Sequence, residues 1–186
     1  MPKSVYIDLG SHFGETVQRF VASRFWHPDF EIHAFEPNPL FTAHDFRNYP
    51  RGVMLHRKAA WVHDGRVELF VNRDRPKNTE GSSVCRGKTT GNLDYDRPEI
   101  VPCVDFDKWI TSSFAPDDHI VVKSNIEGAE YAVFGTMCDN GSIQYLTKLY
   151  LKRHWRKIGM EWEEDRQFLA RLRACLGLDL RTHYDF

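Results

Sequence analysis

Val5–Gly14, reading V-Y-I-D-L-G-S-H-F-G, is the stretch of sequence that decides the fold. Its first half is an apolar run typical of a buried strand, and Gly10 and Gly14 then mark a tight turn into a segment with helical spacing. Further along, the apolar run Ile32–Phe35 ends in Glu36-Pro37-Asn38. A strand, a glycine-rich turn and a second strand with an acid at its tip together predict a nucleotide-type cofactor pocket.

The spacing of the glycines indicates which nucleotide this pocket takes. A dinucleotide fingerprint reads G-x-G-x-x-G, whereas this turn has only Gly10 and Gly14, with the acid Asp8 just before it. That arrangement suits S-adenosylmethionine (SAM), in which backbone groups of the turn would meet the methionine end and Glu36 the ribose. Plainer alternatives are a turn that needs glycine for geometry alone and a helix-start acid favoured by the helix dipole. The predicted cofactor-binding residues are Asp8, Gly10, Ser11, His12, Gly14, Glu36, Pro37 and Asn38.

Composition bounds the class of protein. The 186 residues are 41% hydrophobic with a formal net charge of −1, which predicts one folded domain, residues 1–186, without the basic field that drives nucleic-acid binding. No leader and no apolar stretch of bilayer-spanning length is visible, so we expect a soluble, cytoplasmic protein without a membrane partner. The cysteines have neither zinc spacing nor a disulfide framework, so we expect reduced thiols and no metal. They are Cys85, Cys103, Cys138 and Cys175.

Apolar runs and turn signals alternate along the chain as strands and helices. This pattern predicts a doubly wound α/β fold with a mainly parallel sheet covered by helices on both faces, of the Rossmann-like type. Predicted strands are Ser4–Leu9, Glu31–Phe35, Val53–Lys58, Arg66–Asn72, Glu99–Val104, His119–Lys123, Tyr145–Leu151 and a final extended piece, Leu178–Tyr184. Predicted helices are Glu15–Phe25, Pro39–Asn48, Gly128–Met137 and Glu161–Leu176, and the polar stretch Arg73–Arg97 is predicted to be a loop or lid.

Five blocks of this sequence, taken in order, resemble those of the FkbM-type SAM-dependent methyltransferases. They are Y-I-D-L-G…F-G-E-T, A-F-E-P-N-P, V-D-F-D-K-W-I, K-x-x-I-E-G-A-E and L-Y-L-x-x-H, and they run from Tyr6 to His154. The resemblance implies a class I methyltransferase fold, SAM as the cofactor, and methyl transfer, usually to a hydroxyl oxygen of a sugar, polyketide or other small metabolite.

Two positions depart from the family's pattern. The family block usually reads K-[hydrophobic]-D-[V/I]-E-G-x-E, and this chain has Ser124 and Asn125 in place of the hydrophobic residue and the acid. The later block usually reads E-x-H, where this chain has Lys152-Arg153-His154. Two acids that the resemblance predicts near the substrate are therefore an amide and a cation.

The departures matter because an alcohol needs a base to take its proton during methyl transfer. Asn125 cannot act as a base, although its amide oxygen could orient a hydrogen-bond donor. His154 is our first choice for the base, since its unperturbed pKa lies near neutrality, with a structural histidine as an equal alternative. Lys123 is a further catalytic candidate if burial lowers its pKa, and His12 and Glu127 also stay open, whereas Glu130 is expected to be structural.

The basic run Lys148–Lys157 suggests a small-molecule acceptor that carries a phosphate, carboxylate or sulfate, with Arg86 and Lys88 of the predicted lid joining it. The alternative for this run is a solvated strand edge. Arg153 and Arg156 are the residues whose charge reversal would test the anionic acceptor.

Three rival functions stay open beside O-methylation. The first is a SAM-binding pseudoenzyme with weakened or lost catalysis, because Asn125 and Lys152 replace the expected acids. The second is methylation of nitrogen, although the Pro-Pro-aromatic sequence that accompanies such an Asn is absent after Asn125. The third is an NAD-dependent oxidoreductase, which the missing third glycine disfavours. A partner subunit that covers the crevice, and thus a homo-oligomer, is also open.

Overall fold

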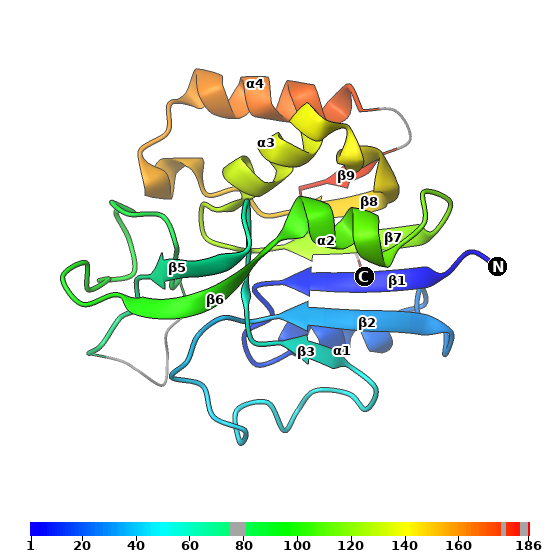
Figure 1. Cartoon of the computed structure of the whole chain (residues 1–186), viewed down its shortest axis with the longest axis horizontal. Coiled ribbons are helices and arrows are strands. Elements are labelled where there is room, and N and C mark those ends of the chain that lie inside the picture. The colour runs from blue at the N-terminus through cyan, green and yellow to red at the C-terminus, as the bar shows by residue number, and fades with distance from the viewer. Residues whose placement is uncertain (75–80, 176–177, 183–185) are drawn as a thin grey trace.

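The computed structural model describes residues 1–74, 81–175, 178–182 and 186. Its main sheet has six strands, all parallel, in the order β3-β2-β1-β7-β8-β9 (Figure 1). They are β1 (Ser4–Leu9), β2 (Phe30–Phe35), β3 (Met54–His56), β7 (His119–Ser124), β8 (Leu146–Leu151) and β9 (Asp179–Arg181). The chain builds outward from β1 to β3 and then crosses to the other side of β1, so the strand order reverses between β1 and β7. Ligands bind at this kind of switch point, beyond the carboxyl ends of the strands.

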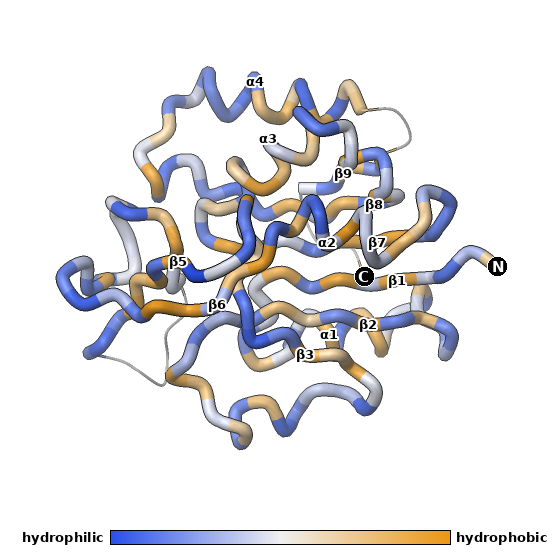
Figure 2. The backbone as a smooth tube through the Cα atoms, in the orientation of Figure 1, coloured by the Kyte–Doolittle hydropathy of each residue, from blue (hydrophilic) through white to orange (hydrophobic). Residues whose placement is uncertain are grey.

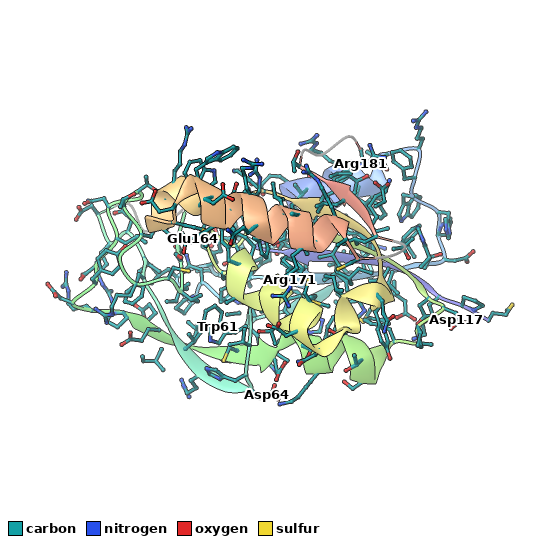
Figure 3. All side chains as sticks on the ribbon, turned by 90° about the horizontal axis from the view of Figure 1, so that it is seen from above. Trp61, Asp64, Asp117, Glu164, Arg171 and Arg181 are labelled. Atoms are coloured by element: carbon teal, nitrogen blue, oxygen red, sulfur yellow. The ribbon has the colours of Figure 1, made fainter. Side chains whose placement is uncertain are left out.

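Helices cover both faces of the main sheet, as predicted. In Figure 1 the helix α1 (Glu15–Val21) lies behind the sheet, and three helices lie in front of it. These three are α2 (Phe106–Ser113), α3 (Glu130–Asn140) and α4 (Trp162–Arg173). Two short 3-10 helices, η1 (Ser142–Tyr145) and η2 (Trp155–Ile158), precede and follow β8. Figure 3 shows α4 and α3 side by side, where Arg171 of α4 forms an ion pair with Asp139 of α3.

Alternation along the central strands divides the core between the two faces, because successive side chains of a strand point to opposite sides. Val5, Ile7 and Leu9 pack with the side chains of α2, α3 and α4, whereas Tyr6 packs with Phe20 of α1. The strands in the middle of the sheet therefore read as continuous apolar runs, which Figure 2 shows as hydrophobic colour along β1 and β7.

A second, three-stranded sheet lies beyond the carboxyl edge of the main sheet (Figure 1). Its central strand β6 (Glu99–Asp105) pairs in parallel with β4 (Ala59–Trp61) and antiparallel with β5 (Gly65–Leu69). Asp105 ends β6 and caps α2, since its side chain accepts a hydrogen bond from the Lys108 backbone. This small sheet places its strands beside the switch point, where they help to enclose it.

The helix predicted over Pro39–Asn48 is wrong. This segment forms successive turns, and side chains take the hydrogen bonds that helix formation would have supplied. The Asn38 side chain accepts from the Leu40 backbone, and Arg57 donates to the carbonyl oxygens of Asn38 and Phe41. Aromatic spacing alone does not distinguish this anchored loop from an amphipathic helix.

Several predicted boundaries also shift. The strand predicted over Val53–Lys58 is β3 alone, after which the chain leaves the main sheet for β4, and the strand predicted over Arg66–Asn72 is β5, which ends at Leu69. The helix predicted over Glu15–Phe25 ends at Val21. Parts of three predictions, the ends Leu176 and Tyr184 and residues 75–80 of the polar loop, lie outside the described residues. Within the described ranges, no helix is both long enough and apolar enough to cross a bilayer.

Candidate functional site

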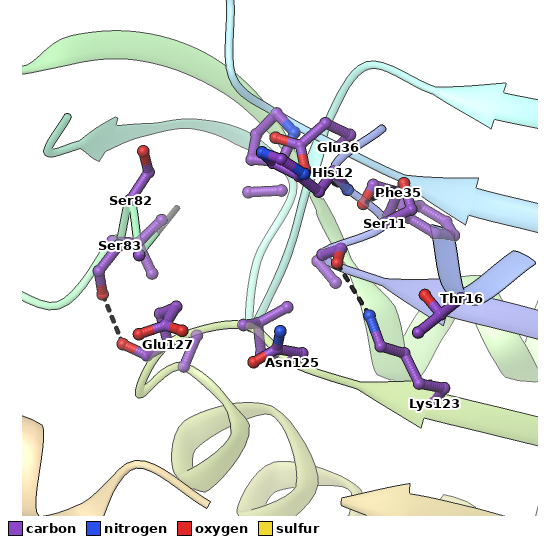
Figure 4. Close-up of a pocket in the computed structure, with 18 of the residues that line it drawn as sticks. Ser11, His12, Thr16, Phe35, Glu36, Ser82, Ser83, Lys123, Asn125 and Glu127 are labelled. Atoms are coloured by element: carbon purple, nitrogen blue, oxygen red, sulfur yellow. Dashed lines mark hydrogen bonds between the residues drawn. The ribbon is translucent and has the colours of Figure 1, made fainter. Parts of the chain in front are cut away.

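A cavity of about 540 Å³ opens at the carboxyl edge of the main sheet, at the switch point between β1 and β7 (Figure 4). The lining comes from the glycine turn and α1, the ends of β2, β7 and β8, the segment after β2, strands β4 and β5 of the second sheet with Lys58 before them, and the loop that follows residue 80. The lining residues are Gly10, Ser11, His12, Glu15, Thr16, Arg19, Phe35, Glu36, Pro37, Phe41, Lys58, Ala59, Ala60, Leu69, Gly81, Ser82, Ser83, Val84, Lys123, Asn125, Ile126, Glu127, Ala129 and Lys152.

Gly10 is required by close packing at the floor of this cavity. Its φ of 72° lies in the left-handed region, and a Cβ atom there would come within 2.2 Å of the Asn125 carbonyl oxygen. The Gly10 N–H donates to Phe35 O at 3.0 Å, and the Asn125 N–H donates to Leu9 O at 3.0 Å. The turn is thus held between the ends of β2 and β7. Gly14 is also left-handed, but a Cβ there would meet the Tyr49 ring and not the cavity.

Glu36 stands at the end of β2, on the cavity wall, and is 8% exposed. Its carboxylate accepts hydrogen bonds from the backbone N–H of His12 at 2.9 Å and of Asn38 at 3.0 Å. Burial raises the pKa of the Glu36 carboxyl in spite of these two bonds. Pro37 lines the cavity, whereas Asn38 is buried behind it and does not.

Asp8 and Lys123 form a buried ion pair under the glycine turn. The two residues face each other in the register of β1 and β7, and Lys123 Nζ lies 2.7 Å from Asp8 Oδ1. Thr16 of α1 donates its hydroxyl proton to the other carboxylate oxygen, and Lys123 also donates to Gly10 O at 2.9 Å. Lys123 reaches the cavity wall, but Asp8 does not line it. Asp8 therefore supports the turn from behind.

Asn125 and Lys152 lie side by side at the ends of β7 and β8, where the Lys152 N–H donates to Ser124 O at 3.0 Å. Both line the cavity. The Asn125 Oδ1 atom is buried, and none of the described residues bonds to it. In Figure 4 the amide nitrogen of Asn125 points toward the middle of the pocket. Lys152 is exposed and has no ion-pair partner among the described residues.

His154, the predicted base, does not line the cavity. It is 3% exposed and lies between two carboxylates, with Nδ1 2.8 Å from Glu130 Oε1 and Nε2 3.2 Å from Glu127 Oε1. Burial alone would lower the pKa of His154, but the two carboxylates outweigh it and raise that pKa. Both ring nitrogens of His154 face carboxylates, which is the arrangement expected for the structural histidine that the sequence left open as an alternative.

Glu127, on the cavity wall, is the centre of a cluster of charges. Its Oε2 atom lies 3.1 Å from Lys88 Nζ and 3.0 Å from Lys157 Nζ, and its Oε1 atom faces His154. Burial alone would raise the pKa of the Glu127 carboxyl, but these three cationic neighbours hold it well below its usual range. The carboxylate is therefore committed to this cluster and is a weak base.

The described part of the predicted lid is a wall of the cavity fixed to the rest of the protein. Ser83 pairs with Phe70 through two backbone hydrogen bonds and donates its hydroxyl to Glu127 O at 2.8 Å. Lys88 is buried, and its ammonium group also donates to Gly81 O at 2.6 Å and Thr90 O at 3.2 Å. Sequence reasoning placed Lys88 in a polar lid and gave no sign that it is buried, because its charged partner, Glu127, lies in a distant segment.

Two cations of the basic run after β8 are paired with acids, and a third stacks on an aromatic ring. Arg153 pairs with Asp165, Arg156 stacks on Trp155 at 4.8 Å, and Lys157 pairs with Glu127. Of this run, Lys152 is the residue that lines the cavity. The second sheet adds Lys58, Ala59 and Ala60, which sequence reasoning missed because they become neighbours of Glu36 only when β4 leaves the main sheet.

The parallel sheet, the glycine turn packed on β7 and the acid at the tip of β2 define the class: a Rossmann-like α/β domain with a nucleotide-type pocket at its switch point. A model of the methyltransferase FkbM domain matches residues 8–176, so the chain belongs to the FkbM methyltransferase family. No curated protein and no solved structure matches the chain.

Proposed function

We propose that this protein transfers the methyl group of SAM to an oxygen atom of a small acceptor. The observation that carries the proposal is the meeting of Gly10, Glu36 and Asn125, from the ends of three neighbouring strands, in one cavity. Gly10 lets the backbone come close to the methyl donor, and Glu36 supplies a buried carboxylate for its ribose. Asn125 lies on the side of the cavity where the acceptor would bind.

The residues present fit the adenosine half of SAM. Gly10 has no side chain that could fill the turn. Among the described residues, two backbone N–H groups bond to the Glu36 carboxylate, which leaves lone pairs for ribose hydroxyls. The bound donor would supply an electrophilic methyl group on a sulfonium. Calorimetric titration with SAM, S-adenosylhomocysteine and NAD⁺ tests this assignment, and binding of NAD⁺ alone would contradict it.

The direction of the Asn125 amide supports oxygen over nitrogen as the accepting atom. An amide nitrogen that points into the pocket donates a hydrogen bond, and an oxygen can accept it on one lone pair and attack with another, whereas a neutral amine has a single lone pair for both. Incubation with methyl-tritiated SAM and a small-molecule fraction of cell extract, followed by identification of the labelled product, tests the reaction itself.

One observation favours the second candidate, a SAM-binding protein without catalysis: the predicted base His154 is enclosed by Glu127 and Glu130. If an ancestral activity has merely been lost, Asn125→Asp combined with Lys152→Glu should restore methyl transfer. If the unmodified protein is active and this double variant is not, the amide and the cation belong to the working site.

A further inference from the structure

Apart from Glu36, which the donor's ribose would occupy, the described residues that line the cavity offer donors and cations but no well-placed base. Glu127 is committed to three cationic neighbours, and Lys123 is paired with Asp8. His12 has Nδ1 at 3.2 Å from Glu15 Oε1, and its Nε2 atom, which none of the described residues bonds to, is buried and not accessible from the cavity. Glu15 itself is 59% exposed at its side chain, and a carboxylate that water solvates is a weak base toward an alcohol.

Groups that bind an anion, in contrast, are available beside the end of β7. Lys152 carries a positive charge on the cavity wall, and the Asn125 amide nitrogen points into the same space. The backbone hydrogen bond from Lys152 to Ser124 places the two residues on adjacent strand ends. Lys58, the other exposed lysine of the wall, follows β3 and lies beyond Glu36, on the side proposed for the donor.

Building on the methyl transfer proposed above, we infer that the acceptor is a small carboxylate, held by Lys152 and the Asn125 amide and converted to its methyl ester. A carboxylate is ionised at neutral pH, so its oxygen attacks without a base. One ammonium group and one amide donor suit the two oxygens of a single carboxylate. The hydrogen bond from Lys152 would be charge-assisted and therefore stronger than one between neutral groups.

The step balances without a proton acceptor. The carboxylate oxygen forms a bond to the methyl carbon as the carbon–sulfur bond breaks, and that electron pair goes to sulfur. The sulfonium loses its positive charge, the carboxylate loses its negative charge, and the products are a methyl ester and a neutral thioether. The protein's part is to align the oxygen with the methyl group and to exclude water.

The first experiment identifies the bond that is made. Unmodified protein is incubated with methyl-tritiated SAM and the small-molecule fraction of a cell extract, and the product is then treated with mild alkali. A methyl ester releases volatile tritiated methanol, whereas methyl ethers, methylamines and methyl phosphates keep their label. Volatile label is the expected result. Label that resists alkali overturns the carboxylate but leaves methyl transfer standing, whereas absence of any labelled product overturns both.

The second experiment tests Lys152 without turnover. Small carboxylates and their primary amides, matched in carbon skeleton, are compared at millimolar concentration for their effect on the melting temperature of the protein saturated with S-adenosylhomocysteine. We expect stabilisation by carboxylates and not by amides, with loss of that difference in Lys152→Met. Lys108→Met, which removes an exposed lysine of α2, is the matched control. Equal responses to both series, or an unchanged difference in Lys152→Met, would contradict the assignment.

Once the ester is identified, steady-state kinetics with the identified acid complete the test. Lys152→Met should raise its KM about 10- to 100-fold, as expected when a charge-assisted hydrogen bond is removed. The rate with unmodified protein should be level from about pH 6 to pH 8, because the attacking carboxylate is already ionised throughout that range and needs no base. A rate that rises through neutral pH and is abolished in His12→Gln would assign a base to His12 and overturn the inference.

Discussion

Glu36 carries the donor-binding proposal at the scale of single residues. Glu36→Ala should weaken SAM binding by about 1–3 kcal/mol, because it removes charge-assisted hydrogen bonds to the ribose and releases the N–H groups of His12 and Asn38. Isothermal titration calorimetry measures the change. Glu31→Ala, on the same strand but in an exposed pair with Lys3, is the control, and equal affinities in the two variants would refute the pocket assignment.

The Asp8–Lys123 pair makes a prediction about stability. Lys123→Met should lower the free energy of unfolding by about 3–5 kcal/mol, because it leaves the Asp8 carboxylate buried without its cation. Urea denaturation measures this loss. The double variant Asp8→Asn with Lys123→Met should recover part of it, since no unpaired charge remains. A double variant less stable than Lys123→Met would show that Asp8 is stabilised by groups other than Lys123.

Among the elements, the loop that begins at Gly81 is held together by a buried ammonium group. Lys88→Met keeps the aliphatic stem but leaves the carbonyl oxygens of Gly81 and Thr90 without their donor. We expect a loss of about 1–3 kcal/mol and faster amide hydrogen exchange confined to this loop. Hydrogen-exchange mass spectrometry checks the location. Arg86 lies on the same loop and forms an exposed ion pair with Glu68 of β5. The control variant Arg86→Met should leave the exchange rates unchanged.

The elements also show where sequence patterns are sufficient and where they fail. Strands buried on both faces, such as His119–Ser124, are predictable because their middle positions, here Ile120, Val121 and Val122, must all be apolar. The helix prediction over Pro39–Asn48 is wrong because the side chains of Asn38 and Arg57 hold the backbone there in turns. The separation of β3 from β4 was not predicted either, since no residue pattern in Val53–Trp61 indicates that the chain passes from one sheet to the other.

For the molecule as a whole, the pair His33 and His56 should make stability depend on pH. His33 Nδ1 lies 3.0 Å from His56 Nε2, and burial, with the neighbouring His56, lowers the pKa of His33 to about 4. Glu31 opposes this shift and Lys3 adds to it. Because the folded pKa lies below the unfolded value, the unfolded chain binds more protons between about pH 4 and pH 6.5. Stability is therefore complete above pH 6.5 and falls as pH decreases toward 4.

The size of this effect can be measured against a variant that does not titrate. We expect a loss of about 2–3 kcal/mol from His33 across this interval. Urea denaturation at a series of pH values should show a smaller decrease for His33→Gln than for the unmodified protein. Parallel curves for the two proteins would mean that His33 does not sense pH in the fold.

The sequence by itself determined the parallel sheet, the glycine turn and the acid at the tip of the second strand. Each of these depends on local periodicity or on a backbone conformation that glycine favours, and such signals are written in contiguous residues. Gly10 and Glu36 can therefore be assigned to one pocket from their positions in the chain alone. The match of the FkbM methyltransferase model over residues 8–176 agrees with that ordered set of motifs.

The tertiary structure alone decided which polar groups remain free to act. His154, Glu127 and Lys88 have the same chemistry in the sequence as any other histidine, acid and lysine, but packing places them together, and their charges satisfy one another. Lys152 and Asn125 remain available to a ligand in the cavity. No described residue neutralises the charge of Lys152, and the amide nitrogen of Asn125 faces into the pocket. Pairing of charges depends on distances between segments remote in the chain, which no local pattern encodes.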